Sequence, residues 1–139
     1  MKIAIINGPN LNLLGTREPH IYGNDSLEAI NKNLSKIFSG QAVLEFFQSN
    51  HEGEIIDYLQ NLKDTKGIII NPGAFTHTSV AIRDTLLALK LPVIEVHLSN
   101  IYAREDFRKI SYFSDISVGT ISGLGKLGYE FAIMALLRA

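Results

Sequence analysis

Short apolar runs alternate along the chain with segments of helical periodicity. The apolar runs cover residues 2–6, 42–48, 67–70, 92–98 and 116–119, and they predict five strands. Three of the runs are apolar almost throughout, as is typical of parallel strands covered on both faces. With right-handed crossovers, the pattern predicts an α/β fold: a flavodoxin-like, doubly wound five-stranded parallel sheet. Its expected strand order is 2-1-3-4-5, with helices on both faces.

Helices are expected between and after these strands. The first begins at Asp25-Ser26, where a side-chain oxygen can cap it, and stops near Gly40. The second follows His51, a third covers about residues 78–89 with Thr78 or Ser79 as its cap, and the last covers residues 124–137. The sequence shows no repeat, low-complexity tract or linker. We therefore expect residues 1–139 to form a single domain.

The connection after the first strand is unusually long. Residues 7–24 show no helical or strand period, whereas a strand and its following helix are usually joined by about two to six residues. This loop is rich in turn formers and carries polar side chains, among them Asn10, Arg17 and Tyr22. Polar groups on a loop at the end of a buried strand are typical of one half of an active site.

Polar residues also follow the third and fourth strands. Open parallel sheets bind ligands at the carboxyl ends of their strands, at the point where the strand order reverses. In the order 2-1-3-4-5, the first, third and fourth strands are neighbours at that point. We therefore expect Asn10, Asn71 and His97 to lie close together.

His97 is the strongest catalytic candidate. A lone histidine after an apolar run is commonly a core residue, but Glu95 lies two positions earlier and hence on the same face of the strand. A carboxylate beside an imidazole fixes its tautomer and raises its proton affinity, as a general acid requires. The pairing and its place at a strand end favour catalysis.

Other polar residues leave two interpretations open. Arg104 and Arg108 are four apart, so they could share one face of a solvated, salt-bridged helix or face an anionic or polyhydroxylated ligand. Asn71 and His77 both belong to the turn after the third strand, so they are expected to share the rim of the site. Asp84, two helical turns beyond His77, could be a surface partner of an arginine.

A tyrosine and an arginine share the first loop. Tyr22 could be a packing or lid residue, or Arg17 could lower its phenol pKa from the reference of about 10 and make it a base.

The composition excludes several functions. The hydrophobic content of 46% and the net charge of −1 describe an ordinary globular chain without the basic excess of a nucleic-acid or membrane-surface protein. With no cysteine, thiol catalysis and cysteine-bound metals are excluded. No dinucleotide or ATP phosphate motif follows the first strand, and the histidines lack metal-ligand spacing, so we expect no metal or cofactor. Without a signal peptide or membrane span, cytoplasm is the default location.

Four motifs of the chain resemble those of the type II 3-dehydroquinate dehydratase family. They are NGPNLNLLGTREP at residues 7–19 followed by Tyr22-Gly23, INPGAFTHTS at 70–79, IEVHLSN at 94–100 and AREDFR at 103–108. The resemblance covers essentially the whole chain, in order and without insertions. His20 stands where the family is commonly acidic or variable, and it is given no role.

The resemblance implies a cofactorless enzyme that removes water from 3-dehydroquinate by anti elimination through an enolate, giving 3-dehydroshikimate in the shikimate pathway. Tyr22 matches the family's base and is held as tyrosinate near Arg17. His97, oriented by Glu95, matches the general acid that protonates the departing hydroxyl. Asn10 matches the residue that holds the water stabilising the enolate.

The resemblance also implies the substrate contacts. Asn71 matches a hydrogen-bonding residue at the leaving-group end, and Leu98 and Ser99 match the residues that hold the substrate carboxylate. His77 and Arg108 match contacts to the ring hydroxyls, while Arg104 matches the arginine of a closing lid.

The family resemblance further implies a homododecamer built from trimers, in which Asp84 reaches into the neighbouring subunit's site.

Two alternatives share the predicted fold. A flavin-binding electron carrier would need a phosphate-binding loop after the first strand, where Pro9 instead removes an N–H donor. A signalling receiver domain would need an acidic pair after the first strand and an aspartate after the third, where Asn7 and Asn71 stand.

Overall fold

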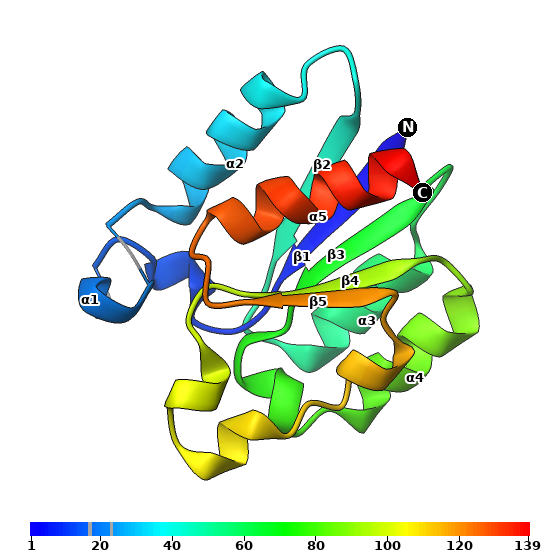
Figure 1. The fold of residues 1–139 in the computed structure, drawn as a ribbon. Helices are drawn as coiled ribbons and strands as arrows, with labels where there is room; N and C mark the ends of the chain where they lie inside the picture. Colours follow the sequence, from blue (N-terminus) through cyan, green and yellow to red (C-terminus); the bar gives the residue numbers. More distant parts are fainter. Residues whose placement is uncertain (17, 23) are drawn as a thin grey trace.

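Five strands form one parallel sheet in the order β2-β1-β3-β4-β5, which confirms the predicted order (Figure 1). The computed structural model describes residues 1–16, 18–22 and 24–139, with the backbone alone described at Pro19 and Tyr22. The strands are β1 Lys2–Asn7, β2 Val43–Gln48, β3 Gly67–Asn71, β4 Val93–His97 and β5 Gly119–Ser122. The helices are α1 Pro19–Tyr22, α2 Leu27–Ile37, α3 Glu52–Gln60, α4 Val80–Leu89 and α5 Leu127–Arg138.

Helices cover both faces of the sheet, as predicted. Along β1, Ile3 and Ile5 belong to the apolar core under α2 and α5, whereas Ala4 and Ile6 belong to the core under α3 and α4. Successive side chains of a strand point to opposite faces, so a strand covered on both sides must be apolar at every position. This requirement explains why continuous apolar runs located the central strands well.

The starts of two helices follow from their caps. The Ser26 hydroxyl accepts the Ala29 N–H at 3.1 Å, so α2 begins at Leu27 as expected. The Ser79 hydroxyl accepts the Ile82 N–H at 3.0 Å, which makes Ser79 rather than Thr78 the cap of α4. The last helix begins later than predicted because Gly123 and Gly125 have positive φ angles of 92° and 60°, which no right-handed helix contains.

The predicted fifth strand was misplaced. Residues 116–119 were expected to form it, but Ile116 ends a 3₁₀ turn, Ser114–Ile116, and β5 begins at Gly119. β5 stands at the end of the sheet order, and its residues Gly119 and Thr120 are exposed. An edge strand of this kind needs no continuous apolar run, so the run before it was the wrong signal.

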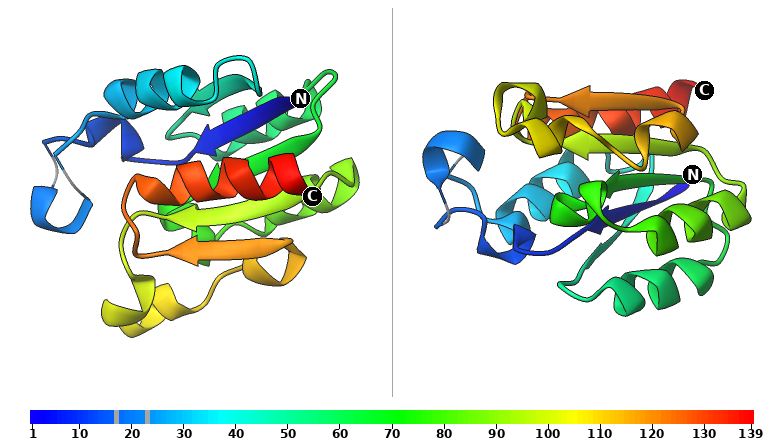
Figure 2. Two further views of the ribbon diagram at one scale, coloured as in Figure 1. Left: turned by 45° about the horizontal axis from the view of Figure 1, so that its top comes forward. Right: turned by 90° about the horizontal axis from the view of Figure 1, so that it is seen from below.

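The long loop after β1 contains two short helices that the sequence analysis did not predict. A 3₁₀ turn, Leu11–Leu13, places Leu11 in the core, and α1 stands out from the body beyond it (Figure 2). Elements of three or four residues are too short to show a hydrophobic period. Figure 2 also shows this loop and the segment after β4 at the same end of the sheet, the end to which the strands point.

The segments that follow β1 and β3 come unusually close together at Gly8. The Gly8 N–H donates to the Asn71 carbonyl at 2.8 Å, and a Cβ added to Gly8 would lie 2.2 Å from the Pro72 carbonyl oxygen. No real Cβ tolerates such a contact, so the backbones would have to separate. The glycine therefore lets the two polar strand ends share one small space.

We predict that Gly8→Ala destabilises the fold by about 1–3 kcal/mol, the usual cost of forcing an extra methyl group into a packed site. Gly53→Ala is the matched control. An added Cβ at Gly53, in α3, would meet nothing within 4 Å, and alanine is the better helix former by about 0.5–1 kcal/mol. The midpoint of urea unfolding should fall for Gly8→Ala and rise for Gly53→Ala. Equal midpoints would contradict the close approach at Gly8.

Candidate active site

A cavity of about 260 Å³ opens at the carboxyl ends of β1, β3 and β4. Most of the predicted site residues line it, namely Asn10, Asn71, His77, His97, Leu98, Ser99, Arg104 and Arg108. The strand register explains the convergence, because Asn7 of β1 pairs with Asn71 of β3 and β4 lies next to β3. The expected meeting of three polar strand ends is thus confirmed as geometry.

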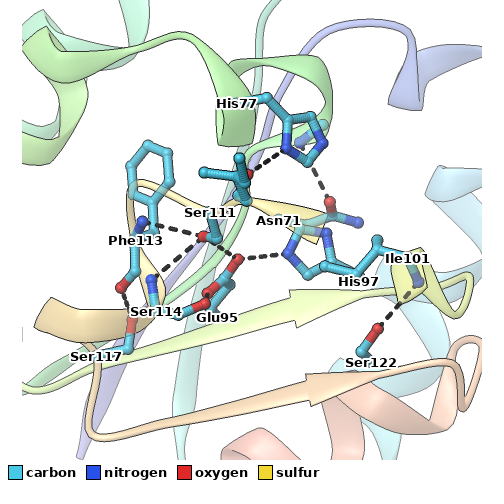
Figure 3. Close-up of polar contacts among 12 residues, drawn as sticks. Asn71, His77, Glu95, His97, Ile101, Ser111, Phe113, Ser114, Ser117 and Ser122 are labelled. Atoms are coloured by element: carbon cyan, nitrogen blue, oxygen red, sulfur yellow. Dashed lines mark hydrogen bonds and ion pairs between the residues drawn. The ribbon is translucent and has the colours of Figure 1, made fainter. Parts of the chain in front are cut away.

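His97 is held at the floor of the cavity by the buried carboxylate of Glu95 (Figure 3). The His97 Nε2 lies 2.5 Å from Glu95 Oε2, and the two side chains share one face of β4. Because a carboxylate can only accept, Nε2 carries a proton, and Nδ1 is the nitrogen left for a ligand. A histidine fixed in this way can act as an acid or a base at Nδ1.

Two serines complete the shell of Glu95. The Ser111 hydroxyl donates to Oε2 at 2.7 Å, and the Ser114 hydroxyl donates to Oε1 at 2.5 Å. Burial alone would raise the pKa of Glu95, but the hydrogen bonds from His97, Ser114 and Ser111 outweigh it and hold the pKa below its ordinary value. Glu95 is therefore an anion at neutral pH.

The sequence analysis missed both serines. They belong to the segment between the Asp106–Lys109 turn and β5, well separated in the chain from Glu95, and serines in a connection usually indicate no more than turn chemistry.

His77 stands on the rim with its ring fixed by the backbone. Its Nδ1 lies 2.6 Å from the Ile110 carbonyl oxygen, and the Phe107 ring meets it edge-on with centroids 6.2 Å apart. Since the carbonyl can only accept, Nδ1 is the donor, and the neutral ring offers Nε2 as an acceptor. The ring is thus suited to receive a hydrogen bond from a ligand hydroxyl.

Two arginines bring positive charge to the same rim. Arg104 has an extended backbone between two 3₁₀ turns, Ile101–Ala103 and Asp106–Lys109, so the predicted helical face containing both arginines is wrong. Both side chains nevertheless line the cavity. Arg104 Nη1 donates to the Ser99 hydroxyl at 3.2 Å, and Arg108 Nε donates to Glu105 at 3.0 Å. Arg108 is thus salt-bridged to Glu105 and also lines the cavity, and its contact with a ligand stays a prediction.

The loop after β1 is fixed by the edge strand β2. Asn10 has a positive φ of 69°, and its N–H donates to the Asn50 side-chain oxygen at 3.0 Å. Gln48 Nε2 donates both to that oxygen, at 3.2 Å, and to the Gly8 carbonyl, at 3.1 Å. Three side-chain bonds therefore support a backbone conformation that few residues other than glycine adopt.

Four predicted site residues are not among the described residues that line the cavity, and one of them, Glu95, contacts it through His97. Asp84 is exposed on α4 and does not line the cavity. The expectation that Asp84 lies two helical turns beyond His77 is wrong, because a 3₁₀ turn, Gly73–His77, ends before α4 begins. Arg17 lies outside the described residues. Tyr22 ends α1, and its side chain is likewise outside what the structure describes.

Within residues 1–16, 18–22 and 24–139, no group of three or more histidine, aspartate or glutamate side chains could hold a metal ion. None of the helices in those ranges has the length and hydrophobicity needed to cross a membrane.

Comparisons with known proteins point to one family and cover nearly the whole chain. The family described as "Dehydroquinase class II" matches residues 1–137. The chain is similar to the 3-dehydroquinate dehydratase of Nitrosomonas eutropha, at 60% identity over 98% of this chain and 96% of that protein. It is also similar to the enzyme of the same name from Prochlorococcus marinus (strain MIT 9301), at 55% identity over 99% and 95%.

Solved structures give the same result. The type II dehydroquinase from Butyrivibrio crossotus superposes with a TM-score of 0.95 at 48% identity, covering 98% of this chain and 97% of that one. The type II dehydroquinase from Propionibacterium acnes superposes with a TM-score of 0.93 at 40% identity, covering 99% and 97%.

We predict that Ser114→Ala lowers stability by about 1–3 kcal/mol at neutral pH, because the buried Glu95 carboxylate loses a donor. The folded-state pKa of Glu95 lies below its unfolded value of 4.5, so the stabilisation is fully present above that value and is lost as the pH falls through the folded pKa. The free energies of unfolding of Ser114→Ala and of the wild type should therefore become equal in acid.

Ser117→Ala is the matched control, because the Ser117 hydroxyl donates to the Phe113 carbonyl at 2.7 Å. The loss of stability caused by Ser117→Ala should not change with pH. Urea unfolding between pH 3 and 7 measures both variants, and parallel curves for the two would show that Ser114 does not support the charge on Glu95.

Proposed function

The chain belongs to the class II dehydroquinase family, and we infer that it is a 3-dehydroquinate dehydratase, a hydro-lyase. The observation that carries this conclusion is the family match over residues 1–137, together with relatives of that name at 52–60% identity. The comparisons do not favour the flavin-binding electron carrier. The cavity supports the conclusion physically, since about 260 Å³ suits a single small ring and its rim carries two arginines for a carboxylate or hydroxyl groups.

We propose that the reaction is an anti elimination through an enolate. Tyr22, as tyrosinate beside Arg17, takes the proton from the carbon next to the ketone, and the electron pair passes to the carbonyl oxygen. The enolate then re-forms the ketone while the carbon–oxygen bond on the neighbouring carbon breaks. The departing hydroxyl takes a proton from His97 and leaves as water, and the product is 3-dehydroshikimate in the shikimate pathway.

The fixed geometry of His97 supports its role as the acid. Glu95 is an anion that holds Nε2, so a protonated His97 has Nδ1 left to give its proton to the leaving hydroxyl. Asn71 lies beside His97 in Figure 3 and is proposed to bond the same hydroxyl.

The remaining roles follow the polarity of the cavity wall. Leu98 and Ser99 would hold the substrate carboxylate, with Arg104 closing over it from its bond to the Ser99 hydroxyl. His77 and Arg108 would bind the ring hydroxyls. Asn10, whose backbone is held by Asn50, would fix the water that stabilises the enolate.

We propose that the enzyme needs no metal or cofactor and acts in the cytoplasm as a homododecamer built from trimers. Asp84 is exposed on α4 and away from its own cavity, which suits a side chain that enters a neighbouring subunit's site. The mass of the purified protein in solution tests the assembly.

We predict that the purified protein converts 3-dehydroquinate to a conjugated enone, seen as rising ultraviolet absorbance. The rate should be the same with and without a metal chelator, because the proposed acid and base are side chains of the protein. Absence of turnover at saturating substrate would overturn the proposed function. A loss of activity with chelator, restored by metal, would overturn the cofactor-independent reaction alone.

We predict that Tyr22→Phe lowers kcat by about a hundredfold or more, because the base is lost while the ring remains. Tyr58→Phe is the matched control. The Tyr58 hydroxyl donates to Glu45 over 3.0 Å, and neither residue lines the cavity. Steady-state kinetics and far-ultraviolet circular dichroism should show two folded proteins of very different kcat. A near-normal kcat for Tyr22→Phe would remove Tyr22 from the role of base.

A further inference from the structure

A buried tyrosine of the last helix joins two strand ends beneath the cavity. Tyr129 is 1% exposed, and its hydroxyl donates to Asn7 Oδ1 at 2.5 Å and accepts from Asn71 Nδ2 at 3.1 Å. Asn7 and Asn71 are register partners at the ends of β1 and β3. Tyr129 does not line the cavity, whereas Asn71 does. The phenol therefore contacts the site through Asn71.

The packing of α5 brings the tyrosine to this position. A Cβ added to Gly128 would lie 3.1 Å from Val96 Cγ1 and 3.4 Å from Ile121 Cγ2, so the first turn of α5 lies directly on β4 and β5. The glycine permits that approach, and the hydroxyl of the next residue, Tyr129, then reaches the ends of β1 and β3. Burial raises the pKa of Tyr129 well above its ordinary value, so the phenol is a neutral donor and acceptor at neutral pH.

The order of donors and acceptors fixes the amide of Asn71. A phenol has one hydrogen, and here Asn7 Oδ1 takes it, so the phenol oxygen must accept from Asn71 Nδ2. The Gly73 N–H can only donate, and it lies 3.3 Å from Asn71 Oδ1. Both neighbours thus select the same orientation, in which Nδ2 has one hydrogen on Tyr129 and a second left to donate.

We propose that Tyr129 is a positioning residue that sets the amide orientation of Asn71 for the departing hydroxyl. This inference rests on the proposed dehydration, in which Asn71 contacts the leaving group beside His97. As the carbon–oxygen bond breaks, negative charge grows on that oxygen, and a donor already aimed at it needs no rearrangement. Without the phenol hydroxyl, the Asn71 amide loses the acceptor for one hydrogen and can rotate, so the donor is aimed correctly only part of the time.

The test compares Tyr129→Phe with Tyr58→Phe, which loses a hydroxyl bonded to Glu45 in a different part of the fold. We expect Tyr129→Phe to lower kcat about tenfold, as for one lost transition-state hydrogen bond, with KM changed by less than about twofold. Tyr58→Phe should leave both constants unchanged. Equal kinetics for the two variants would overturn the inference.

A double-mutant cycle identifies Asn71 as the residue through which Tyr129 acts. In an Asn71→Ala background, Tyr129→Phe should lower kcat no further, because the amide that it orients is gone. A further tenfold fall in that background would mean that Tyr129 acts on stability or on another group, and it would also overturn the inference.

Asn7→Ala tests the same link from its other end and does not depend on the folding of Tyr129→Phe. Without the Asn7 acceptor, the phenol hydrogen can turn to Asn71 and favour the opposite amide orientation. The kcat should again fall about tenfold, and again only while Asn71 is present. Wild-type turnover of 3-dehydroquinate in the same assays separates the two conclusions, since an inactive wild type refutes the dehydratase, and an active wild type with unaffected variants refutes only the role of Tyr129.

Discussion

A parallel sheet places the carboxyl ends of all its strands on one edge, and the site depends on this constraint. At the junction of β1 and β3, the chain leaves toward helices on opposite faces, so the connecting loops separate and leave a hollow between them. Asn71 at the end of β3, His97 at the end of β4 and Asn10 in the loop after β1 then line one cavity. Gly8 makes that space small, because its missing side chain lets the loop after β1 touch Pro72.

Polar groups at such an edge need hydrogen-bond partners, and three networks supply them. Glu95 takes donors from His97, Ser111 and Ser114. The Tyr129 hydroxyl joins Asn7 to Asn71, and Gln48 and Asn50 hold the loop at Asn10. An unpaired buried polar group costs about 1–3 kcal/mol, and an unpaired carboxylate more, so the two buried networks, around Glu95 and around Tyr129, persist only in their complete geometry. The same requirement that stabilises the fold therefore fixes the direction of two side chains that face the cavity, His97 and Asn71.

The sequence predicted the sheet and most of the cavity wall for different reasons. The central strands are buried on both faces and are therefore mostly apolar, so β1, β3 and β4 were found nearly residue by residue. The edge strand β5 carried no such requirement and was misplaced. The Glu95–His97 pair was visible because two residues two apart on a strand share a face. The contacts of Ser111, Ser114 and Tyr129 could not be predicted from the sequence. They join segments that only the fold brings together, and the spacing of polar residues along the chain does not indicate them. The roles of Tyr22 and Arg17 came from the family resemblance, and they stay predictions.

The two ends of the cavity differ in how firmly they are built, and the difference matches the chemistry proposed for each. At the His97 end, the imidazole is held by the Glu95 carboxylate, which is 0% exposed, and Glu95 is held in turn by donors from another segment of the chain. The position of His97 is therefore set before any ligand arrives. At the rim, Arg104 and Arg108 are half-buried and lie near the exposed Glu105, an arrangement that solvent screens and a substrate anion can replace. A leaving group that gains charge during the reaction benefits most from donors that do not move, whereas a substrate that must enter and depart benefits from contacts that exchange easily. The sheet supplies the first kind of contact and the connecting segments supply the second, which explains why one fold edge can serve both requirements.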